Sequence, residues 1–401
     1  MKPDLVRGAF YLTCGALLSI LFSIAVSQIL LALALAALLL SSTKLRLPPI
    51  KLPLGLFLAG TVLSLLASGQ IAEGMPQIRK FYVFFILLVA YSTLRTLAEI
   101  RAIVLLWAAI ATLSAARSFF QFWRIYRQSQ AQHVGFYEFY VGSRITGFMS
   151  HWMTFGAEEM IVLLLLAAYL FFSGERRWKK TGWLCAAILA CSMVLGFTRS
   201  IFLLGFPLGL LYLLWFWRKW LIAAAPAVVL IAFFLGPHAL RERIASVVEP
   251  RADVDSNRHR AVLRDTGLAM VRAHPWLGLG PEQIKYQIDR WIPASDRPLP
   301  IGDYEHLHNV YLQYAAERGL PTLFFFLWMI AKILWDFGRA LLRKTVNAEA
   351  RFILHGSMAV ILALLAEGFA EYNFGDSEVL TLFLAVVAFG YVASQDGETA
   401  S

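Results

Sequence analysis

The stretch GAFYLTCGALLSILFSIAVSQILLALALAALLLSST, residues 8–43, contains no charged side chain and lies between Arg7 and Lys44. A membrane-spanning helix needs about 20 mostly apolar residues. The stretch is therefore long enough for a hairpin of two spanning helices, which we expect near 8–24 and 26–42. It is also much longer than the apolar core of a cleavable signal peptide, which has about 7–15 residues. We expect the hairpin to stay in the mature protein.

The rest of the chain has the composition of a membrane protein. Of its 401 residues, 59% are hydrophobic and 15% are charged, and its mean hydropathy is +0.64, whereas soluble chains are nearer half apolar and a quarter charged. This excludes an ordinary soluble enzyme and a disordered chain. The net charge of +10 does not indicate nucleic-acid binding, because a basic DNA-binding domain would not be this apolar. Cys14, Cys185 and Cys191 all lie in apolar runs, so no disulfide framework or zinc site is expected.

Further apolar segments extend the prediction to about twelve spans. They lie near 53–69, 80–96, 102–123, 152–172, 181–197, 200–217, 219–235, 321–337, 352–370 and 378–394. We therefore expect an all-α polytopic membrane protein in three parts. Residues 1–235 hold nine spans, residues 236–320 form a large loop, and residues 321–401 hold three spans and a short tail.

The distribution of Lys and Arg predicts the orientation, because short cytoplasmic loops carry an excess of both. With the N-terminus inside, most basic residues of the short loops fall on the cytoplasmic side, so both termini are expected there. Six lie in short loops on the other side: Arg79, Lys80, Arg124, Arg127, Arg144 and Arg199. Arg124 and Arg127 have an alternative reading as surface side chains that reach the headgroups. Arg199 lies in a tight turn between two spans, so we expect it to have a function.

The loop at 236–320 lies on the same outer side and is too long to be a plain connection. Between Pro237 and Leu307 it carries ten Lys or Arg and ten Asp or Glu, so its charge is balanced. We expect short helices near 238–248, 257–273 and 281–290, a turn at 275–281, and a further helix from about His306.

Three arginines cluster on the predicted helix 257–273. Arg258 lies in its first turn, and Arg260 and Arg264 are four residues apart and so share a face. Arginine binds phosphate oxygens through a planar fork, so these side chains could bind a multiply charged anion at the membrane surface. The alternative is a solvated helix face paired with Asp265.

The segment His308-Asn309, nine further residues and Gly319 form the second candidate element. We expect His308 on a short helix that shares one face with Gly319. Gly319 is expected to end that helix and Pro321 to start the next span. Histidine is the side chain best suited to accept a proton near neutral pH, so His308 is a candidate general base. An amphipathic anchor at the interface is the alternative.

The carboxylates of the sequence do not form a pattern that predicts a metal site. Asp253-Val-Asp255 loosely matches the Asp-x-Asp pattern of metal-dependent sugar transferases, but no histidine or further carboxylate accompanies it at a fixed spacing. Six other carboxylates near or inside spans are each expected to pair with an arginine or to line a wet cavity. They are Glu73, Glu158, Glu159, Glu317, Glu367 and Glu371.

The loop motifs resemble those of the O-antigen ligase/polymerase superfamily of bacterial inner-membrane proteins. The segment from Asn257-Arg-His-Arg260 through Met270 to His274-Pro-Trp-Leu-Gly-Leu-Gly280 is similar to its signature. Two motifs of the ligase branch resemble Arg264-x-x-x-Leu268 and His308-Asn-x9-Gly319-x-x-Thr322. Arg144 and Arg199 also stand where members of that family carry arginines.

The resemblance implies a glycosyltransferase that works at the periplasmic face, similar to the membrane-embedded inverting GT-C class and without a metal or other cofactor. It would move a glycan from undecaprenyl diphosphate to the lipid A–core oligosaccharide, with membrane lipids around it. His308, Arg264 and Arg199 are then the expected catalytic residues. The residues expected to bind the donor diphosphate or the acceptor are Arg258, Arg260, Arg144, Asn309 and Gly319.

Three other activities stay open. An O-antigen polymerase would use the same donor and a second lipid-linked glycan, and a protein O-oligosaccharyltransferase would use a Ser or Thr as acceptor. Protein O-oligosaccharyltransferases usually carry an additional soluble region, so the short tail after the last span makes this activity less expected. A transporter of lipid-linked sugar is commonly built from repeated halves, and no halves repeat in this sequence.

Overall fold

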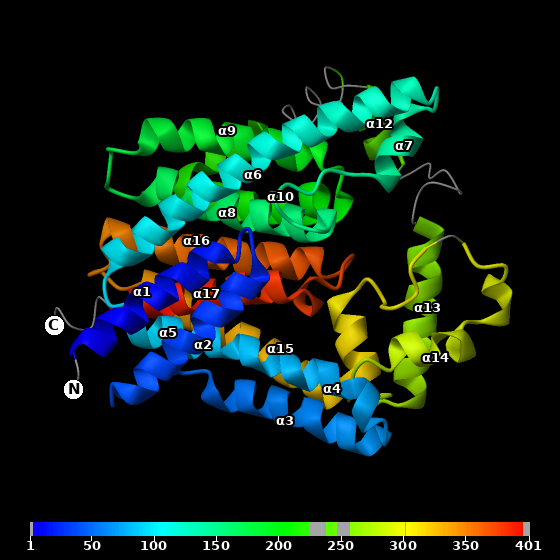
Figure 1. The fold of residues 1–401 in the computed structure, drawn as a ribbon, viewed down its shortest axis with the longest axis horizontal. Coiled ribbons are helices and arrows are strands. Elements are labelled where there is room, and N and C mark those ends of the chain that lie inside the picture. Colours follow the sequence, from blue (N-terminus) through cyan, green and yellow to red (C-terminus); the bar gives the residue numbers. More distant parts are fainter. Residues whose placement is uncertain (1–2, 225–233, 235–237, 247–256, 301, 396–401) are drawn as a thin grey trace.

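The computed structural model describes residues 3–224, 234, 238–246, 257–300 and 302–395, which contain helices and no strand. Long helices lie side by side in a bundle, and shorter helices lie mainly at one end of it (Figure 1). The bundle contains α1 (Pro3–Ser19), α2 (Ile24–Leu40), α3 (Lys51–Ser68), α5 (Phe85–Thr93), α6 (Leu97–Ala131), α8 (Trp152–Phe172), α9 (Lys179–Leu195), α10 (Phe206–Arg218), α15 (Val310–Leu341), α16 (Ala348–Glu367) and α17 (Ser377–Gln395). The shorter helices are α4 (Ile71–Arg79), α7 (Phe136–Gly142), α12 (His238–Ala245), α13 (Asn257–Ala273) and α14 (Ile284–Trp291).

The prediction of an all-α polytopic membrane protein is confirmed. Seven of the described helices are long and apolar enough to cross a membrane, and the shorter α2 is also apolar. Helix lies at each predicted span except the ninth, 219–235, most of which falls outside the described residues. The predicted number of twelve spans therefore stays a prediction.

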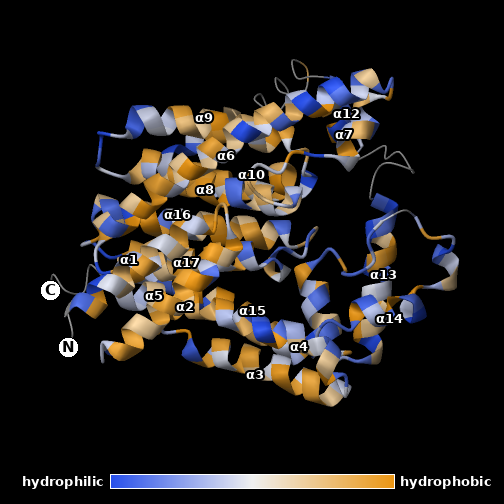
Figure 2. Cartoon of the chain, in the orientation of Figure 1, coloured by the Kyte–Doolittle hydropathy of each residue, from blue (hydrophilic) through white to orange (hydrophobic). Residues whose placement is uncertain are grey.

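Helix α8 forms the centre of the bundle. Every residue from Thr154 to Leu170 is buried, as expected for a helix that is apolar all round. It packs against α6, α9, α10 and α16, and α16 packs in turn against α17. The apolar residues gather in these helices, whereas α13 and α14 carry many polar ones (Figure 2).

The two ends of the bundle differ. Helix α1 begins and α17 ends at one end, here called the terminal end, and α12, α13 and α14 lie at the other, here called the loop end (Figure 1). Which side of the membrane each end faces stays a prediction. Helix α15 runs from the loop end into the tenth predicted span and is interrupted at Gly319, next to the expected boundary at residue 320.

The helices predicted in the loop are present as α12, α13 and α14, but the one expected from His306 begins later. Asn309 caps α15, because its side-chain oxygen accepts a hydrogen bond from the backbone N–H of Leu312 at 2.9 Å. His308 has a φ of +46°, a left-handed conformation that a right-handed helix does not contain. The prediction that His308 lies on a helix is therefore wrong. The break predicted at Gly319 is confirmed, since this residue interrupts α15 with φ 81° and ψ 163°.

Candidate active site

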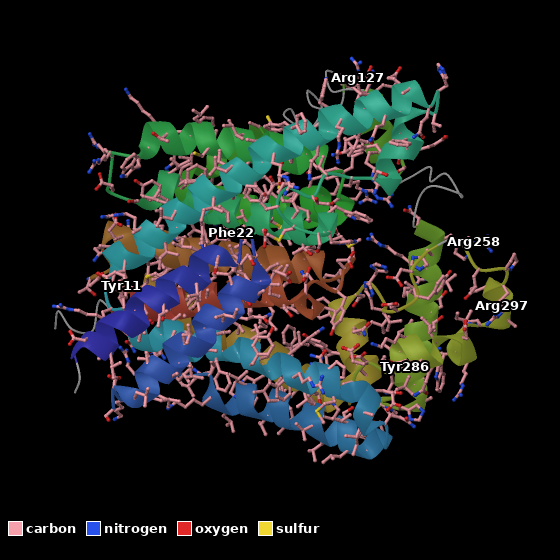
Figure 3. All side chains as sticks on the ribbon, viewed as in Figure 1. Tyr11, Phe22, Arg127, Arg258, Tyr286 and Arg297 are labelled. Carbon is pink, nitrogen blue, oxygen red and sulfur yellow. The ribbon has the colours of Figure 1, made fainter. Side chains whose placement is uncertain are left out.

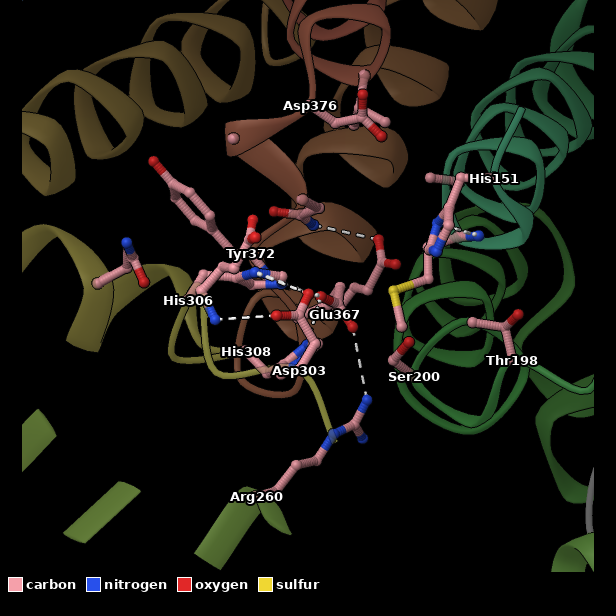
Figure 4. A pocket seen from close by; sticks show the side chains of 18 of the residues that line it. His151, Thr198, Ser200, Arg260, Asp303, His306, His308, Glu367, Tyr372 and Asp376 are labelled. Atoms are coloured by element: carbon pink, nitrogen blue, oxygen red, sulfur yellow. Dashed lines mark hydrogen bonds and ion pairs between the residues drawn. The ribbon is translucent and has the colours of Figure 1, made fainter. Parts of the chain in front are cut away.

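A cavity of about 590 Å³ lies at the loop end. The start of α8, the turn before α10, helices α12 and α13, and the segments that precede α15 and α17 all contribute side chains to it (Figure 4). Most of these side chains are polar or charged, which is unusual at the edge of an apolar bundle.

Four arginines from separate segments line this cavity and are here called the arginine wall: Arg144, Arg199, Arg243 and Arg260. Burial, together with the charges of the other three, lowers the pKa of the Arg144 guanidinium to about 9. Burial also lowers the pKa of Arg260. Cations held this close repel one another, and an anion between them would remove that repulsion. The arginine wall is therefore suited to a multiply charged anion.

The turn that carries Arg199 has an unusual backbone. Phe197 has a φ of +53°, which a bulky residue rarely adopts, and residues 200–205 form one turn of π-helix, a feature that often marks functional sites. Arg243 holds the turn by donating from Nε to the Phe197 carbonyl at 3.0 Å. The Arg199 guanidinium is nearly buried and donates to the carbonyl and hydroxyl of Ser246 at 3.0 and 3.1 Å. Two members of the arginine wall are thus fixed by the same turn.

A buried carboxylate, Glu371, connects the arginine wall to His308. One oxygen of Glu371 lies 2.8 Å from Nδ1 of His308, and the other lies 3.5 Å from a terminal nitrogen of Arg260. His306 approaches the first oxygen at 3.6 Å. A carboxylate that accepts from Nδ1–H of a histidine fixes its tautomer, so Nε2 of His308 is the nitrogen left to exchange a proton with a bound molecule.

The neighbouring groups keep Glu371 ionised. Burial alone would raise the pKa of the Glu371 carboxyl, but the nearby His306, the hydrogen-bonded His308 and the charge of Arg260 outweigh it and hold the pKa well below its usual range. Burial and the neighbouring His308 lower the pKa of His259 to about 4. His259 is therefore neutral near pH 7, and the negative charge of Glu371 is directed at His308, His306 and Arg260.

His306, His308 and Glu371 could also hold a metal ion, since one ligand atom from each lies within 4.8 Å of the others. Two histidines and one carboxylate are a donor set that zinc accepts. The guanidinium of Arg260 beside Glu371 opposes a second cation at this place. The arrangement therefore fits a histidine oriented by a carboxylate better than a metal centre.

Residues 184–327 match a family model described as O-antigen ligase. This match, over about a third of the chain, supports membership of the O-antigen ligase superfamily. Together with the apolar helices, it supports a membrane protein with a transferase function of the ligase or polymerase type in general. The matched segment contains three members of the arginine wall and His308, whereas Arg144 and Glu371 lie outside it. No curated protein matches the chain.

Half of the residues expected from the superfamily motifs meet in the cavity: Arg144, Arg199, Arg260 and His308. Arg264 does not line it; its side chain is 65% exposed and pairs with Asp265 at 2.9 Å, as in the alternative reading of a solvated face. Arg258 is exposed on the outer side of α13 and donates to the carbonyl of Pro298 at 3.4 Å (Figure 3). Of the three arginines in the cluster on α13, only the middle one, Arg260, therefore lines the cavity.

Asn309, the second residue of the His-Asn motif, contacts protein backbone. Besides capping α15, its side-chain nitrogen donates to the carbonyl of Phe369 at 3.0 Å. The N–H of Val310 donates to the carbonyl of Gly368 at 2.8 Å. These bonds tie the segment of His308 to the segment of Glu371 and so set the distance between the two side chains.

The two superfamily motifs of the loop pack on each other at Gly319. Backbone hydrogen bonds join Leu279 to Ala316 (2.8 Å) and Leu320 to Pro275 (2.8 Å). A Cβ atom on Gly319 would lie 2.0 Å from the carbonyl oxygen of Trp276. The glycine is therefore required for the close approach of the Pro-Trp-Leu-Gly segment to α15.

We predict that Gly319→Ala destabilises the protein by about 1–3 kcal/mol or more, because the backbone region it occupies is open essentially to glycine alone and the methyl group meets the Trp276 carbonyl. Gly338→Ala is the matched control, since a Cβ there meets nothing within 4 Å and alanine favours the helix by about 0.5–1 kcal/mol. Thermal unfolding in detergent measures both. Equal unfolding temperatures for the two variants would contradict the packing role of Gly319.

Sequence reasoning missed Arg243, His259 and His306 as cavity residues. His306 stands two residues before His308 and His259 between two arginines of the cluster, so their position in the motifs was the available signal; Arg243 had none beyond its place in the loop. The expectation for the glutamates holds for Glu317, Glu367 and Glu371, which line the cavity. It is wrong for Glu158 and Glu159, which are buried in α8, do not line the cavity and have no ion-pair partner among the described residues.

Proposed function

We propose that this protein is an O-antigen ligase, which transfers a glycan from undecaprenyl diphosphate to a sugar hydroxyl of the lipid A–core oligosaccharide. The observation that carries the proposal is that the arginine wall and the His308–Glu371 pair line one cavity. The sorting of basic residues assigns the terminal end to the cytoplasm and the loop end to the periplasm. The cavity would then face the compartment in which lipid-linked glycan and lipopolysaccharide core meet.

The arginine wall is proposed to bind the donor diphosphate. In the transfer, the bond between the anomeric carbon of the first sugar and the diphosphate oxygen breaks, and negative charge grows on the phosphate oxygens. Cations that are already in place for this charge give the largest catalytic effect in many enzymes. Arg199 and Arg260 line the cavity from different elements, the turn before α10 and helix α13, so a bound diphosphate would be held by two separate segments of the chain.

His308 is proposed to activate the acceptor. A sugar hydroxyl is a weak nucleophile, and His308 would remove its proton through Nε2 as the oxygen forms a bond to the anomeric carbon. Glu371 would stabilise the imidazolium that results, since its pKa stays far below neutrality. Attack opposite to the leaving diphosphate inverts the configuration at the anomeric carbon. The proton on His308 then passes to solvent or to the released diphosphate.

The decisive experiment mixes the purified protein with lipid-linked glycan and lipid A–core in detergent, without ATP or added metal. We expect a glycan joined to lipid A–core, visible as a shift on a gel and by mass spectrometry. Longer lipid-linked glycan in the absence of lipid A–core would identify a polymerase instead. Transfer to a Ser- or Thr-containing peptide would identify a protein transferase, and movement of the donor across vesicles without a product would identify a transporter.

We predict that the transfer does not depend on a metal ion. An excess of chelator should leave the rate unchanged, because arginines and not a cation neutralise the diphosphate in this proposal. Loss of activity that zinc restores would assign the metal to His306, His308 and Glu371. Restoration by magnesium or manganese would instead point to Asp253 and Asp255, which lie outside the described residues.

A further inference from the structure

A second charged groove lies at the terminal end, far from the cavity along α15 and α17. It has a volume of about 280 Å³ and lies between the last turns of these two helices and the segment before α3. Three charged residues of α15 line it, Lys332, Asp336 and Arg339, together with Arg343 just after the end of the helix. Lys332, Asp336 and Arg339 are separated by four and three residues, so they form one stripe along the helix.

Asp336 is fully engaged within the groove. Lys332 donates to both of its oxygens at 3.1 and 2.9 Å, and the Tyr391 hydroxyl donates to one of them at 2.8 Å. Among the described residues, this carboxylate is paired with Lys332 and not with Arg339. Arg339 is exposed and has no hydrogen-bond or ion-pair partner among the described residues. The described charged residues of the groove, three cations and one carboxylate, sum to a net positive charge.

Exposed apolar residues lie close to Arg339 along the chain. Trp335, four residues before Arg339, is 66% exposed, and Leu342 is 85% exposed. Tryptophan beside basic residues is typical of the membrane–water interface. A ligand in this groove could therefore place a negative group against Arg339 and hydrocarbon against Trp335 and Leu342.

We infer that the groove binds the phosphate of an anionic phospholipid from the leaflet at the terminal end. Basic pockets between helices on the cytoplasmic side bind such headgroups, and arginine binds a phosphate diester through two parallel hydrogen bonds. The assignment is independent of the proposed reaction, because the groove contains none of the cavity residues.

The test measures lipid binding to the purified full chain by native mass spectrometry in a neutral detergent. Phosphatidylglycerol should bind more tightly than phosphatidylcholine, and Arg339→Gln should weaken phosphatidylglycerol binding about fivefold. Arg176→Gln is the matched control, since Arg176 is an exposed arginine in the segment between α8 and α9 at the same end but outside the groove. It should bind like the unchanged protein.

Three results would overturn the inference. Equal binding of the two lipids would show that the charge of the headgroup does not matter. An equal loss of phosphatidylglycerol affinity in Arg339→Gln and Arg176→Gln would show that the lipid responds to the general basicity of this end and not to the groove. Displacement of the lipid by inorganic phosphate at equal concentration would make the groove a site for a free anion. Unfolding temperatures verify that the variants are folded. If Arg339→Gln does not fold, Arg343→Gln, which removes another cation of the groove, provides an independent measurement.

Discussion

His308→Ala should lower the rate of glycan transfer about 10²–10⁴-fold, the usual loss when a general base is removed. The expectation rests on the position of His308 in the cavity and on its 2.8 Å contact with Glu371, which leaves Nε2 to act on the acceptor. The measurement is the initial rate with saturating donor and acceptor, scaled to the amount of folded protein. His274→Ala is the matched control, because His274 lies in the same loop and does not line the cavity. That variant should retain its rate.

The dependence of the rate on pH separates a base from a residue that only orients the acceptor. A base accepts a proton only in its unprotonated form, so the rate of the unchanged protein should fall as the pH is lowered if a base is required. His308→Ala should lose this fall together with most of its rate. Near-normal turnover of the variant, or a residual rate with the same fall at low pH, would show that another group is the base.

Glu371→Gln tests the second half of the pair. Glutamine keeps the size of the side chain but removes the charge that supports the imidazolium, and it can present an N–H to His308 in place of an acceptor. We expect a lower maximal rate with little change in the apparent affinity for acceptor, since Glu371 contacts His308 and Arg260 and not the acceptor in this scheme. A change in affinity alone would make Glu371 a binding residue.

The sequence predicted the elements of the loop better than their contacts. Helix α13 spans the predicted residues 257–273, since its apolar positions recur with helical spacing and Pro275 follows its end. The helix expected at His306 begins at Val310, because the side chain of Asn309 caps it and His308 takes a left-handed conformation. A capping residue can be recognised in a sequence, but an Asn after a His reads equally well inside a helix.

The contact between His308 and Glu371 could not be predicted from spacing. The two residues are 63 positions apart, and the bundle brings them together because α15 leaves the loop end at the place where α16 returns to it. The sequence indicated only that a carboxylate near a span end needs a cation or a wet cavity. Glu371 has both, Arg260 and the cavity, but the sequence alone offered several arginines as its partner.

Helical periodicity also could not decide between Arg260 and Arg264. The two side chains share a face of α13, yet that of Arg260 is 28% exposed and that of Arg264 is 65% exposed. The side of α13 that packs on the protein carries His259, Val262, Leu263, Thr266, Gly267 and Met270. Arg260 lies at the beginning of the helix beside the cavity, and one turn later the same face is in solvent. Which of the two arginines reaches the cavity therefore depends on its position along α13 and on the tilt of that helix.

The different exposure of Arg260 and Arg264 predicts different effects when each is replaced. Arg260→Ala and Arg199→Ala should each lower the transfer rate about 10²–10³-fold, as the loss of one fixed donor to a developing anion does. The corresponding Lys variants should recover only part of the rate, because a point charge does not replace a two-pronged guanidinium. Arg264→Ala should keep its rate, since Arg264 pairs with Asp265 outside the cavity. It is the matched control on the same helix.

Two further measurements test whether the loss of rate reflects binding of the diphosphate. Removal of Arg260 also takes a cation from Glu371, so Arg260→Lys, which keeps that charge, must show the loss as well. Inorganic diphosphate should inhibit the unchanged protein and should inhibit Arg199→Lys less, because the weakened site binds the leaving group less tightly. If Arg264→Ala lost activity and Arg260→Lys did not, the arginine wall would not be the donor site, and helix α13 would have to turn its outer face toward the donor when it binds.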